Sequence, residues 1–289
     1  MTRQEHLSRY RGKVEEGRPL IGAGAGTGIS AKCAAAAGVD FIVIYNAGRF
    51  RMAGRGSMAG MMPFGNANDI VVEMAMEVLP VATPTPVLAG VCATDPTKNI
   101  SMLLETLKSM GFAGVQNFPS VCLLDGSVRE DLEATGYGFD KEVAMVARAR
   151  ELDLLTATYV RTDDEARAMA GAGADVIVAH VGLTAAGMIG GRNAVGLDEA
   201  AEKTQRVHDV VRSVNDEAFV VCHGGPIVSP GDAEYVLKRC DGVTGFLGAS
   251  SMERIPVEIA ITETIRAFTE IKLAPVIDPL NETRQEATL

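Results

Sequence analysis

The sequence predicts a single (β/α)8 TIM barrel that covers residues 1–289. Short apolar runs alternate with helical patterns along the whole chain, which is typical of parallel βαβ units. The segment AGVDFIV (37–43) is echoed four units later by AGADVIV (172–178), and each copy joins a helix to a strand. Two Gly-rich turns, HGGP (223–226) and GASS (248–251), follow the last two apolar runs, where barrels often bind phosphate.

The elements follow in order from these runs. The expected strands are residues 19–23, 40–46, 87–91, 114–119, 154–159, 175–180, 219–222 and 242–247. The expected helices include 69–79, 141–151, 197–215 and, after the last strand, 256–272, which would finish the ring. Residues 1–18 predict a polar helix that covers the bottom of the barrel, and residues 278–289 a polar tail. Residues 47–68, 120–137 and 181–196 are expected to be loops.

Composition limits the partners of this chain. The apolar fraction of 47% is ample for a core, and the formal charge of −10 argues against nucleic acid. The five cysteines stand singly with no CxxC pair, which argues against a disulfide framework. The start of the chain has no apolar signal region, and no apolar run approaches the ~20 residues of a membrane helix. We therefore expect a cytoplasmic protein with no membrane partner.

Catalytic candidates come from the ends of the strands, because barrels keep their chemistry at the carboxyl edge. His180 and His223 end neighbouring strands and are expected to face one another as general acid and base. Asp95 and Glu253 are the acidic candidates at this edge. The alternative is structural, since a histidine at a strand end can simply bond a loop carbonyl.

Binding candidates form a polar ring at the same edge. The two Gly-rich turns predict an anion cradle of Gly224, Gly225, Gly248, Ser250 and Ser251, unless they are only tight turns with helix caps. Arg49 or Arg192 would close over the anion. The remaining candidates, at the ends of the first, second, fourth and fifth strands, are Gly24, Gly26, Tyr45, Asn46, Gln116, Asn117 and Tyr159.

The loop 47–68 is rich in Gly, Met and Arg, and loops of this length are often functional. It is equally consistent with a lid and with a subunit contact. Its Met-rich part, residues 52–62, is too apolar to remain in water alone and predicts a homo-oligomer.

Several chemistries are disfavoured by missing motifs. No lysine ends a strand, so a Schiff-base aldolase is not expected. No HxH, HExxH or GxSxG motif occurs, which disfavours a strong metal cage and a nucleophilic-serine hydrolase. The GAGTG turn at 24–28 lacks dinucleotide spacing and a following acidic residue. The two histidines with Asp95 stay open as ligands of a divalent ion.

Six segments spread over the chain carry a resemblance to a known family: PLIGAGAGTGISAK, DFIVIYNAGRFRMAGRGSMAG, GVQNFPSV, VIVAHVGLTAAG, VVCHGGPI and GFLGASSMER. The chain resembles the TIM-barrel phosphoenolpyruvate hydrolase-like family and is similar to the C-terminal domain of plant tobamovirus-resistance proteins. That family is placed near the phosphoenolpyruvate mutase and isocitrate lyase superfamily. The resemblance implies action on 2-oxo acids or phosphonates with Mg²⁺, although no cluster of Asp and Glu ligands is found here.

These observations together lead to one expected function. The chain is expected to hydrolyse or cleave a small anionic 2-oxo acid or phosphorylated or phosphono acid, such as phosphoenolpyruvate or phosphonopyruvate. A metal-assisted C–C lyase or aldolase is the enzyme alternative. A non-catalytic metabolite-binding or signalling subunit is the alternative of another class.

Overall fold

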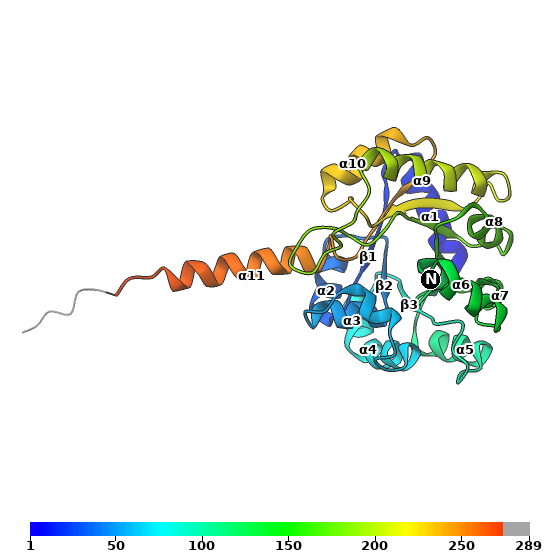
Figure 1. The fold of residues 1–289 in the computed structure, drawn as a ribbon, viewed down its shortest axis with the longest axis horizontal. Coiled ribbons are helices and arrows are strands. Elements are labelled where there is room, and N and C mark those ends of the chain that lie inside the picture. Colours follow the sequence, from blue (N-terminus) through cyan, green and yellow to red (C-terminus); the bar gives the residue numbers. More distant parts are fainter. Residues whose placement is uncertain (274–289) are drawn as a thin grey trace, which may run out of the picture. The chain divides into compact units, whose positions relative to one another are not determined.

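The computed structural model describes residues 1–273, and it confirms the predicted barrel. The strands pair in parallel in the order β1 to β8, and β8 closes on β1. Helices surround these strands (Figure 1). The strands are β1 Leu20–Gly24, β2 Phe41–Ile44, β3 Val87–Gly90, β4 Gly114–Gln116, β5 Leu155–Val160, β6 Val176–His180, β7 Phe219–His223 and β8 Gly245–Gly248.

Helices follow the strands and extend beyond the predicted set. In the described part of the chain they are α1 Arg3–Glu15, α2 Gly28–Ala36, α3 Asn46–Met52, α4 Ala67–Ala82, α5 Ile100–Met110, α6 Gly126–Ala134, α7 Phe139–Glu151, α8 Asp163–Gly171, α9 Leu197–Arg212, α10 Pro230–Arg239 and α11 Arg254–Thr269. Two short 3₁₀ helices are η1 Ser57–Met61 and η2 Val121–Leu123. The chain divides into two compact units, Met1–Pro256 and a second unit from Val257 on. The single domain over 1–289 stays a prediction, and the predicted tail 278–289 lies outside the described residues.

Two segments predicted to be loops contain helices, so those predictions were wrong. The segment 47–68 contains α3 and η1, and Gly60 packs so tightly that an added Cβ would lie 2.6 Å from the Ala47 side chain. The segment 120–137 contains η2 and α6. Both helices are short, and tertiary packing rather than local periodicity supports helices of this length.

Several element ends also differ from their predicted positions. Helix α4 begins two residues before Asp69, because the Asn66 side chain accepts from the Asp69 N–H as the N-cap. Strand β4 ends at Gln116 rather than at residue 119. Beyond Gln116, the Asn117 side chain replaces the backbone hydrogen bonds between β4 and β5. Its Oδ1 accepts from the Tyr159 N–H at 2.7 Å.

Helix α1 closes the amino-terminal end of the barrel, as predicted. Thr2 and Glu5 form a capping box that starts it. The buried ring of Tyr10 packs against Phe41 and Phe219, at the starts of β2 and β7, with ring centroids 6.3 and 6.1 Å apart.

The two repeated segments, residues 37–43 and 172–178, make equivalent contacts at the amino-terminal end of the barrel. Asp40 and Asp175 occupy the same position in the two copies. Asp40 accepts from the Ile21 N–H and pairs with Lys13, whereas Asp175 accepts from the Thr156 N–H and pairs with Arg3. Each aspartate therefore fastens a strand to helix α1.

Among the described residues, no helix combines the length and apolar character needed to cross a membrane.

Candidate active site

A small cavity lies at the carboxyl end of the strands, inside the barrel unit. Its volume is about 40 Å³, room for a few water molecules. The ends of five strands supply its polar groups, namely Tyr45, Tyr159, His180, His223 and Ser250, and Arg51 enters from α3. The rest of the wall is Ala47, Ser57, Met58, Phe118, Leu123, Gly182, Leu183, Thr184 and Ala249.

His223 and Tyr159 form a hydrogen-bonded pair in this cavity. His223 Nδ1 lies 2.6 Å from the Leu247 carbonyl oxygen, which can only accept, so Nδ1 carries the proton of the neutral ring. His223 Nε2 is then an acceptor, and it lies 3.2 Å from the Tyr159 hydroxyl. The hydroxyl therefore donates to His223, whose Nε2 can act as a base.

His180 has the opposite tautomer. Its Nδ1 accepts from the Gly182 N–H at 3.3 Å, which places the ring proton on Nε2. Its ring centroid lies 4.9 Å from that of His223 and 5.0 Å from that of Tyr159. The predicted meeting of the two histidines is confirmed, and the pair offers one proton acceptor beside one donor.

The environment keeps all three rings uncharged near neutral pH. Burial, helped by His223 and Arg161, holds the pKa of His180 well below its ordinary value. Burial lowers the pKa of His223 to about 4, against the opposing effect of the Leu247 carbonyl. Burial and the neighbouring Tyr45 raise the pKa of Tyr159 well above its ordinary value, so it stays a hydroxyl.

A buried ion pair borders the cavity. Arg51 donates from Nε and Nη2 to Glu253 Oε2 at 2.9 and 2.6 Å, and the two side chains are 1% and 2% exposed. Glu253 Oε1 accepts from the Gly26 N–H at 2.6 Å and from the Ser30 hydroxyl. Burial by itself lowers the pKa of Arg51, but Tyr45 and Glu253 outweigh it and raise the pKa. The pair thus keeps a charged guanidinium beside the cavity.

The carboxylates of the two predicted acids, Glu253 and Asp95, are bound by other groups of the protein. The carboxylate of Glu253 is engaged by Arg51, Gly26 and Ser30. Asp95 accepts from Asn66, Asn68 and Thr97 at the end of β3 and is not part of the cavity wall. Both carboxylates hold neighbouring loops in place.

The predicted anion cradle is only partly brought together. Ser250 lines the cavity, whereas Ser251 lines a groove on the outer wall of the barrel. Gly225 and Gly224 adopt positive φ, and the Gly225 N–H donates to the Gly182 carbonyl at 2.8 Å. Gly248 lies against Met252, 2.5 Å from an added Cβ. The Gly225 N–H is therefore already used within the protein.

The other predicted binding residues fall into three groups. Tyr45 and Tyr159 line the cavity, and Gly24 makes room for the Tyr45 hydroxyl, which would lie 2.7 Å from an added Cβ. Three buried amides lie around it without lining it: Asn46 donates to the Gly60 carbonyl, Asn117 bonds Glu142 and Tyr159, and the Gln116 side chain finds no hydrogen-bond partner within residues 1–273. Arg49 pairs with Glu73 at the surface, and Arg192 is exposed.

Arg51 is the residue that sequence reasoning did not single out among the arginines of the loop 47–68. It stands in the predicted loop beside Arg49, and without a helix there the two arginines look alike. In α3, Ala47 and Arg51 are four residues apart on one buried face, while Arg49 lies on another. The signal that could have identified Arg51 is its spacing: it follows the small residue Ala47 by four positions, so the two would share one face of a helix.

The donor set does not fit a divalent cation. Among residues 1–273 no three His, Cys, Asp or Glu side chains come together as a group able to hold a metal ion. The carboxylate at the cavity is already bound by a guanidinium, and carboxylate oxygens are the ligands that Mg²⁺ prefers.

Comparison with known proteins identifies the family. The sequence profile described as phosphoenolpyruvate hydrolase-like matches residues 5–271. The chain belongs to the phosphoenolpyruvate hydrolase-like family. It is also similar to two Solanum lycopersicum proteins, the ToMV susceptible protein tm-1(GCR26) and the ToMV resistance protein Tm-1(GCR237), with 57% and 56% identity over 92% of this chain. The aligned region is 35% of either relative, so the chain spans about a third of their length.

Solved structures support the family's barrel fold. The crystal structure of 2,3-dimethylmalate lyase, a member of the PEP mutase/isocitrate lyase superfamily, is similar with a TM-score of 0.60, 14% identity and 99% coverage of both chains. Phosphonopyruvate hydrolase in complex with oxalate and Mg²⁺ gives a TM-score of 0.57 at 14% identity, covering 99% of this chain and 96% of its own. At such low identity these likenesses establish the fold of this family member.

Proposed function

We propose that this barrel is an enzyme that acts on a small anionic 2-oxo acid, or on a phosphorylated or phosphono acid such as phosphoenolpyruvate or phosphonopyruvate. The observation that carries the proposal is the buried Arg51 guanidinium beside a small cavity that is also lined by two neutral histidines and two tyrosines. The solved neighbours that act on small acids support the substrate class. The reaction is hydrolysis, or cleavage of a C–C or C–P bond next to the carbonyl.

Arg51 is the group that recognises the anion in this proposal. A guanidinium matches a carboxylate or phosphate with paired donors, and burial strengthens that attraction. Glu253 accepts from Nε and Nη2 of the guanidinium, and Tyr45 is a second side-chain partner, so in this proposal the ligand binds the remaining N–H groups. Ser250, at the end of β8, adds a polar group to the same wall.

The two histidines divide the proton transfer. His223 Nε2 accepts a proton, either from the Tyr159 hydroxyl or from a water that it activates. His180 Nε2–H donates to oxygen on the substrate, where charge develops. Because both rings are neutral near pH 7, neither needs to gain or lose a proton before the substrate binds.

The size of the cavity sets a condition on binding. A volume of about 40 Å³ is small for an acid of this class, so in this proposal part of the wall moves when the ligand binds. Ser57 and Met58 from η1, with Leu183 and Thr184 from the loop after β6, form that part. In this proposal the segment 47–68 is a lid, and a subunit contact is the alternative for it.

The test is a panel of small acids with a matched pair of arginine variants. Phosphoenolpyruvate, phosphonopyruvate, oxaloacetate and inorganic phosphate are titrated calorimetrically, and turnover of each acid is followed with and without a chelator. Arg51→Lys keeps the charge but loses the fork, and we expect it to weaken anion binding by at least 10-fold, roughly the effect of one lost charge-assisted bond. Arg49→Lys, from the same helix, is the control and should bind as the parent does.

The outcomes separate the alternatives. Turnover that survives the chelator supports the side-chain mechanism, and turnover lost with the chelator indicates the metal-assisted lyase. Binding with no turnover of any acid indicates a metabolite-binding subunit. If no acid binds, or if Arg51→Lys and Arg49→Lys bind equally well, the proposed site is wrong.

A further inference from the structure

The backbone of Tyr159 is held on one side by a side chain instead of a strand. The backbone pairing of β4 with β5 ends at Gln116 and Ala157, two residues before Tyr159. Beyond it, the Asn117 side chain accepts from the Tyr159 N–H at 2.7 Å and donates to the Tyr159 carbonyl at 3.1 Å. Asn117 is fully buried, and its amide therefore fixes Tyr159 in the way that a neighbouring strand would.

A buried carboxylate on helix α7 holds Asn117 in turn. Glu142 is fully buried, and its Oε2 accepts from Asn117 Nδ2 at 2.6 Å. Oε2 also accepts from the Ser120 hydroxyl at 2.7 Å, and Oε1 accepts from the Val121 N–H at 2.8 Å. These donors are all uncharged, and burial of a carboxylate is costly unless its hydrogen bonds compensate for the lost water. Since apolar side chains often fill buried positions without loss of stability, the carboxylate indicates a role beyond stability.

The same carboxylate holds part of the cavity wall. Phe118 and Leu123, which line the cavity, are the two ends of the segment 118–123. Glu142 bonds the middle of this segment through the hydroxyl and the N–H group described above. The Phe118 ring also contacts the Tyr159 ring, with centroids 6.3 Å apart. One side chain outside the cavity therefore fixes both a wall segment and the backbone of a polar residue in the wall.

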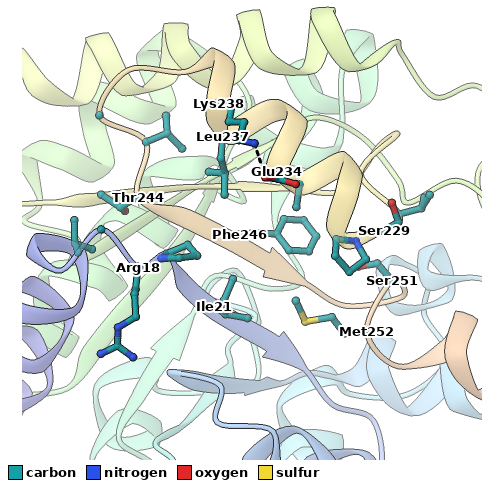
Figure 2. Close-up of a pocket in the computed structure, with 18 of the residues that line it drawn as sticks. Arg18, Ile21, Ser229, Glu234, Leu237, Lys238, Thr244, Phe246, Ser251 and Met252 are labelled. Carbon is teal, nitrogen blue, oxygen red and sulfur yellow. Dashed lines mark ion pairs between the residues drawn. The ribbon is translucent and has the colours of Figure 1, made fainter.

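The hydrogen bonds continue across the barrel to its eighth strand. The Tyr159 hydroxyl bonds His223 Nε2 at 3.2 Å, and His223 Nδ1 donates to the Leu247 carbonyl at 2.6 Å. Leu247 follows Phe246, whose ring Figure 2 shows in a groove on the outer wall of the barrel. Because successive residues of a strand face opposite sides, Leu247 faces the barrel interior. The base of the proposed reaction is therefore held between α7 on one side and β8 on the other.

We propose that Glu142 is a positioning residue of this site. Acting through Asn117, it holds the Tyr159 hydroxyl against the base. This role rests on the proposed function, because it matters to catalysis only if His223 is that base. It also explains Asn117, a predicted binding residue that does not line the cavity. The ligand-free chain is sufficient for a test, since the hydrogen bond at His223 is present before any substrate binds.

The test is a double-variant cycle that is read by ¹⁵N NMR of the histidine rings. The chain has 4 histidines, so the His223 signals are assigned by their loss in His223→Asn. Near neutral pH, the ¹⁵N shift of His223 Nε2 reports whether this nitrogen accepts a hydrogen bond. Tyr159→Phe removes the donor and defines the full change, and Asn117→Ala should produce about half of it or more. The chain with both changes should match Tyr159→Phe alone, because a residue that acts through the hydroxyl has no effect once the hydroxyl is gone.

Glu142→Gln tests the carboxylate itself. Glutamine has the same shape, but in either orientation its NH₂ group meets a donor, at Asn117 or at Val121. We expect Glu142→Gln to move the His223 signal in the same direction as Asn117→Ala does. Where Asn117→Ala does not fold, Glu142→Gln combined with Tyr159→Phe completes the same cycle.

Glu165→Gln is the matched control. Glu165 is also a buried carboxylate, on the neighbouring helix α8, and it accepts from the Arg161 and Thr162 N–H groups at 2.9 and 3.1 Å. None of these three residues lines the cavity. Its substitution perturbs a buried carboxylate to the same extent, yet it should leave the His223 signal at its parent position.

Three results overturn the proposal. An unchanged His223 signal in both Asn117→Ala and Glu142→Gln means that Tyr159 keeps its place without them. Additive changes in the double variant mean that Asn117 affects the base by another route. A signal that Glu165→Gln moves as far as Glu142→Gln does means a general loosening of the barrel.

Turnover separates this proposal from the proposed function. If the panel of acids identifies a substrate, Asn117→Ala should lower kcat by roughly 10-fold or more and leave KM near the parent value, because Arg51 still binds the anion. An Asn117→Ala chain with a raised KM and the parent kcat contradicts the positioning role. If no acid is bound or turned over, the proposed function fails, whereas the NMR cycle still decides how Tyr159 is held.

Discussion

The two ends of the barrel bury charge for different purposes. At the amino end, Asp40 and Asp175 bond the backbone of β1 and β5 and pair with Lys13 and Arg3 of α1. At the carboxyl end, the Arg51–Glu253 pair borders a cavity together with His180 and His223. The charges at the amino end are all paired with groups of the fold. At the carboxyl end, His223 offers a base and His180 a donor at the wall of the cavity. The comparison teaches that burial of charge alone does not mark a site, and that polar atoms facing a cavity do.

The largest expected effect is on turnover at the carboxyl end. His223→Asn removes the base, and a lost general acid or base costs roughly 10²–10⁴-fold in rate. Tyr159→Phe, which keeps the ring but removes the hydroxyl that bonds His223 and Tyr45, should cost less. We expect the melting temperature of His223→Asn to change little, because replacing a residue of the cavity lining by Asn should reduce the free energy of unfolding by about 1 kcal/mol or less. Rates measured on any acid that the panel identifies check this, and a His223→Asn enzyme with the parent rate contradicts it.

The next effect is a loss of stability when the buried ion pair at the carboxyl end is broken. Glu253→Ala leaves Arg51 buried and unpaired, which we expect to reduce the free energy of unfolding by about 3–5 kcal/mol. Urea unfolding measures the loss. Glu217→Ala is the control, because Glu217 forms an exposed pair with Arg11 and should change stability by less than about 0.5 kcal/mol. Equal losses in the two variants would mean that Arg51 finds other partners or water.

At the amino end we expect a smaller loss with no effect on ligands. Asp175→Ala leaves the buried Thr156 N–H without its acceptor and frees Arg3, which predicts a loss of about 2 kcal/mol. Binding of phosphate or of an acid from the panel should be unchanged, since Asp175 lies at the opposite end of the barrel from the cavity. Calorimetric titration of the variant checks this, and weakened binding would show that the two ends are coupled.

The last effect is gradual, because it is a dependence of stability on pH. The unfolded chain protonates a histidine near pH 6.5, whereas folded His223 does so only near pH 4. The unfolded state therefore binds more protons between these values, and the free energy of unfolding falls as pH falls through that window, by up to about 1.4 kcal/mol per pH unit. Urea unfolding of the parent and of His223→Asn between pH 4 and 7 measures the difference. A constant difference over this range contradicts the prediction.

Glu142 should change the free energy of unfolding with pH in the opposite direction to His223, in the same experiment. Burial raises the pKa of Glu142 from 4.5 to about 7, although Ser120, Val121 and Asn117 donate to it. The folded chain then holds a proton that the unfolded chain has lost, so the free energy of unfolding falls as pH rises from 4.5 to 7. Glu142→Gln should remove this part of the slope while leaving that of His223. If the slope is unchanged, Glu142 does not titrate in this range.

The sequence by itself determined the barrel and the pair of histidines. Each strand and Gly-rich turn is encoded by neighbouring residues, and parallel strands put His180 and His223 opposite each other once they pair in register. The echo at Asp40 and Asp175 was also visible, because half-barrel repeats keep the same local contacts. Such features depend on local pattern and on the regular geometry of a parallel sheet.

Only the tertiary structure decided which polar groups meet. Arg51 and Glu253 are 202 residues apart, and their pairing exists only because the barrel closes. The same closure directs the Gly225 N–H to Gly182 and thereby removes it from the predicted anion cradle. Arg49 and Arg51 are indistinguishable by local sequence until α3 packs with one face inward. The physical reason is that a hydrogen bond or an ion pair needs distances near 3 Å, and residue pattern alone does not determine distances between distant segments.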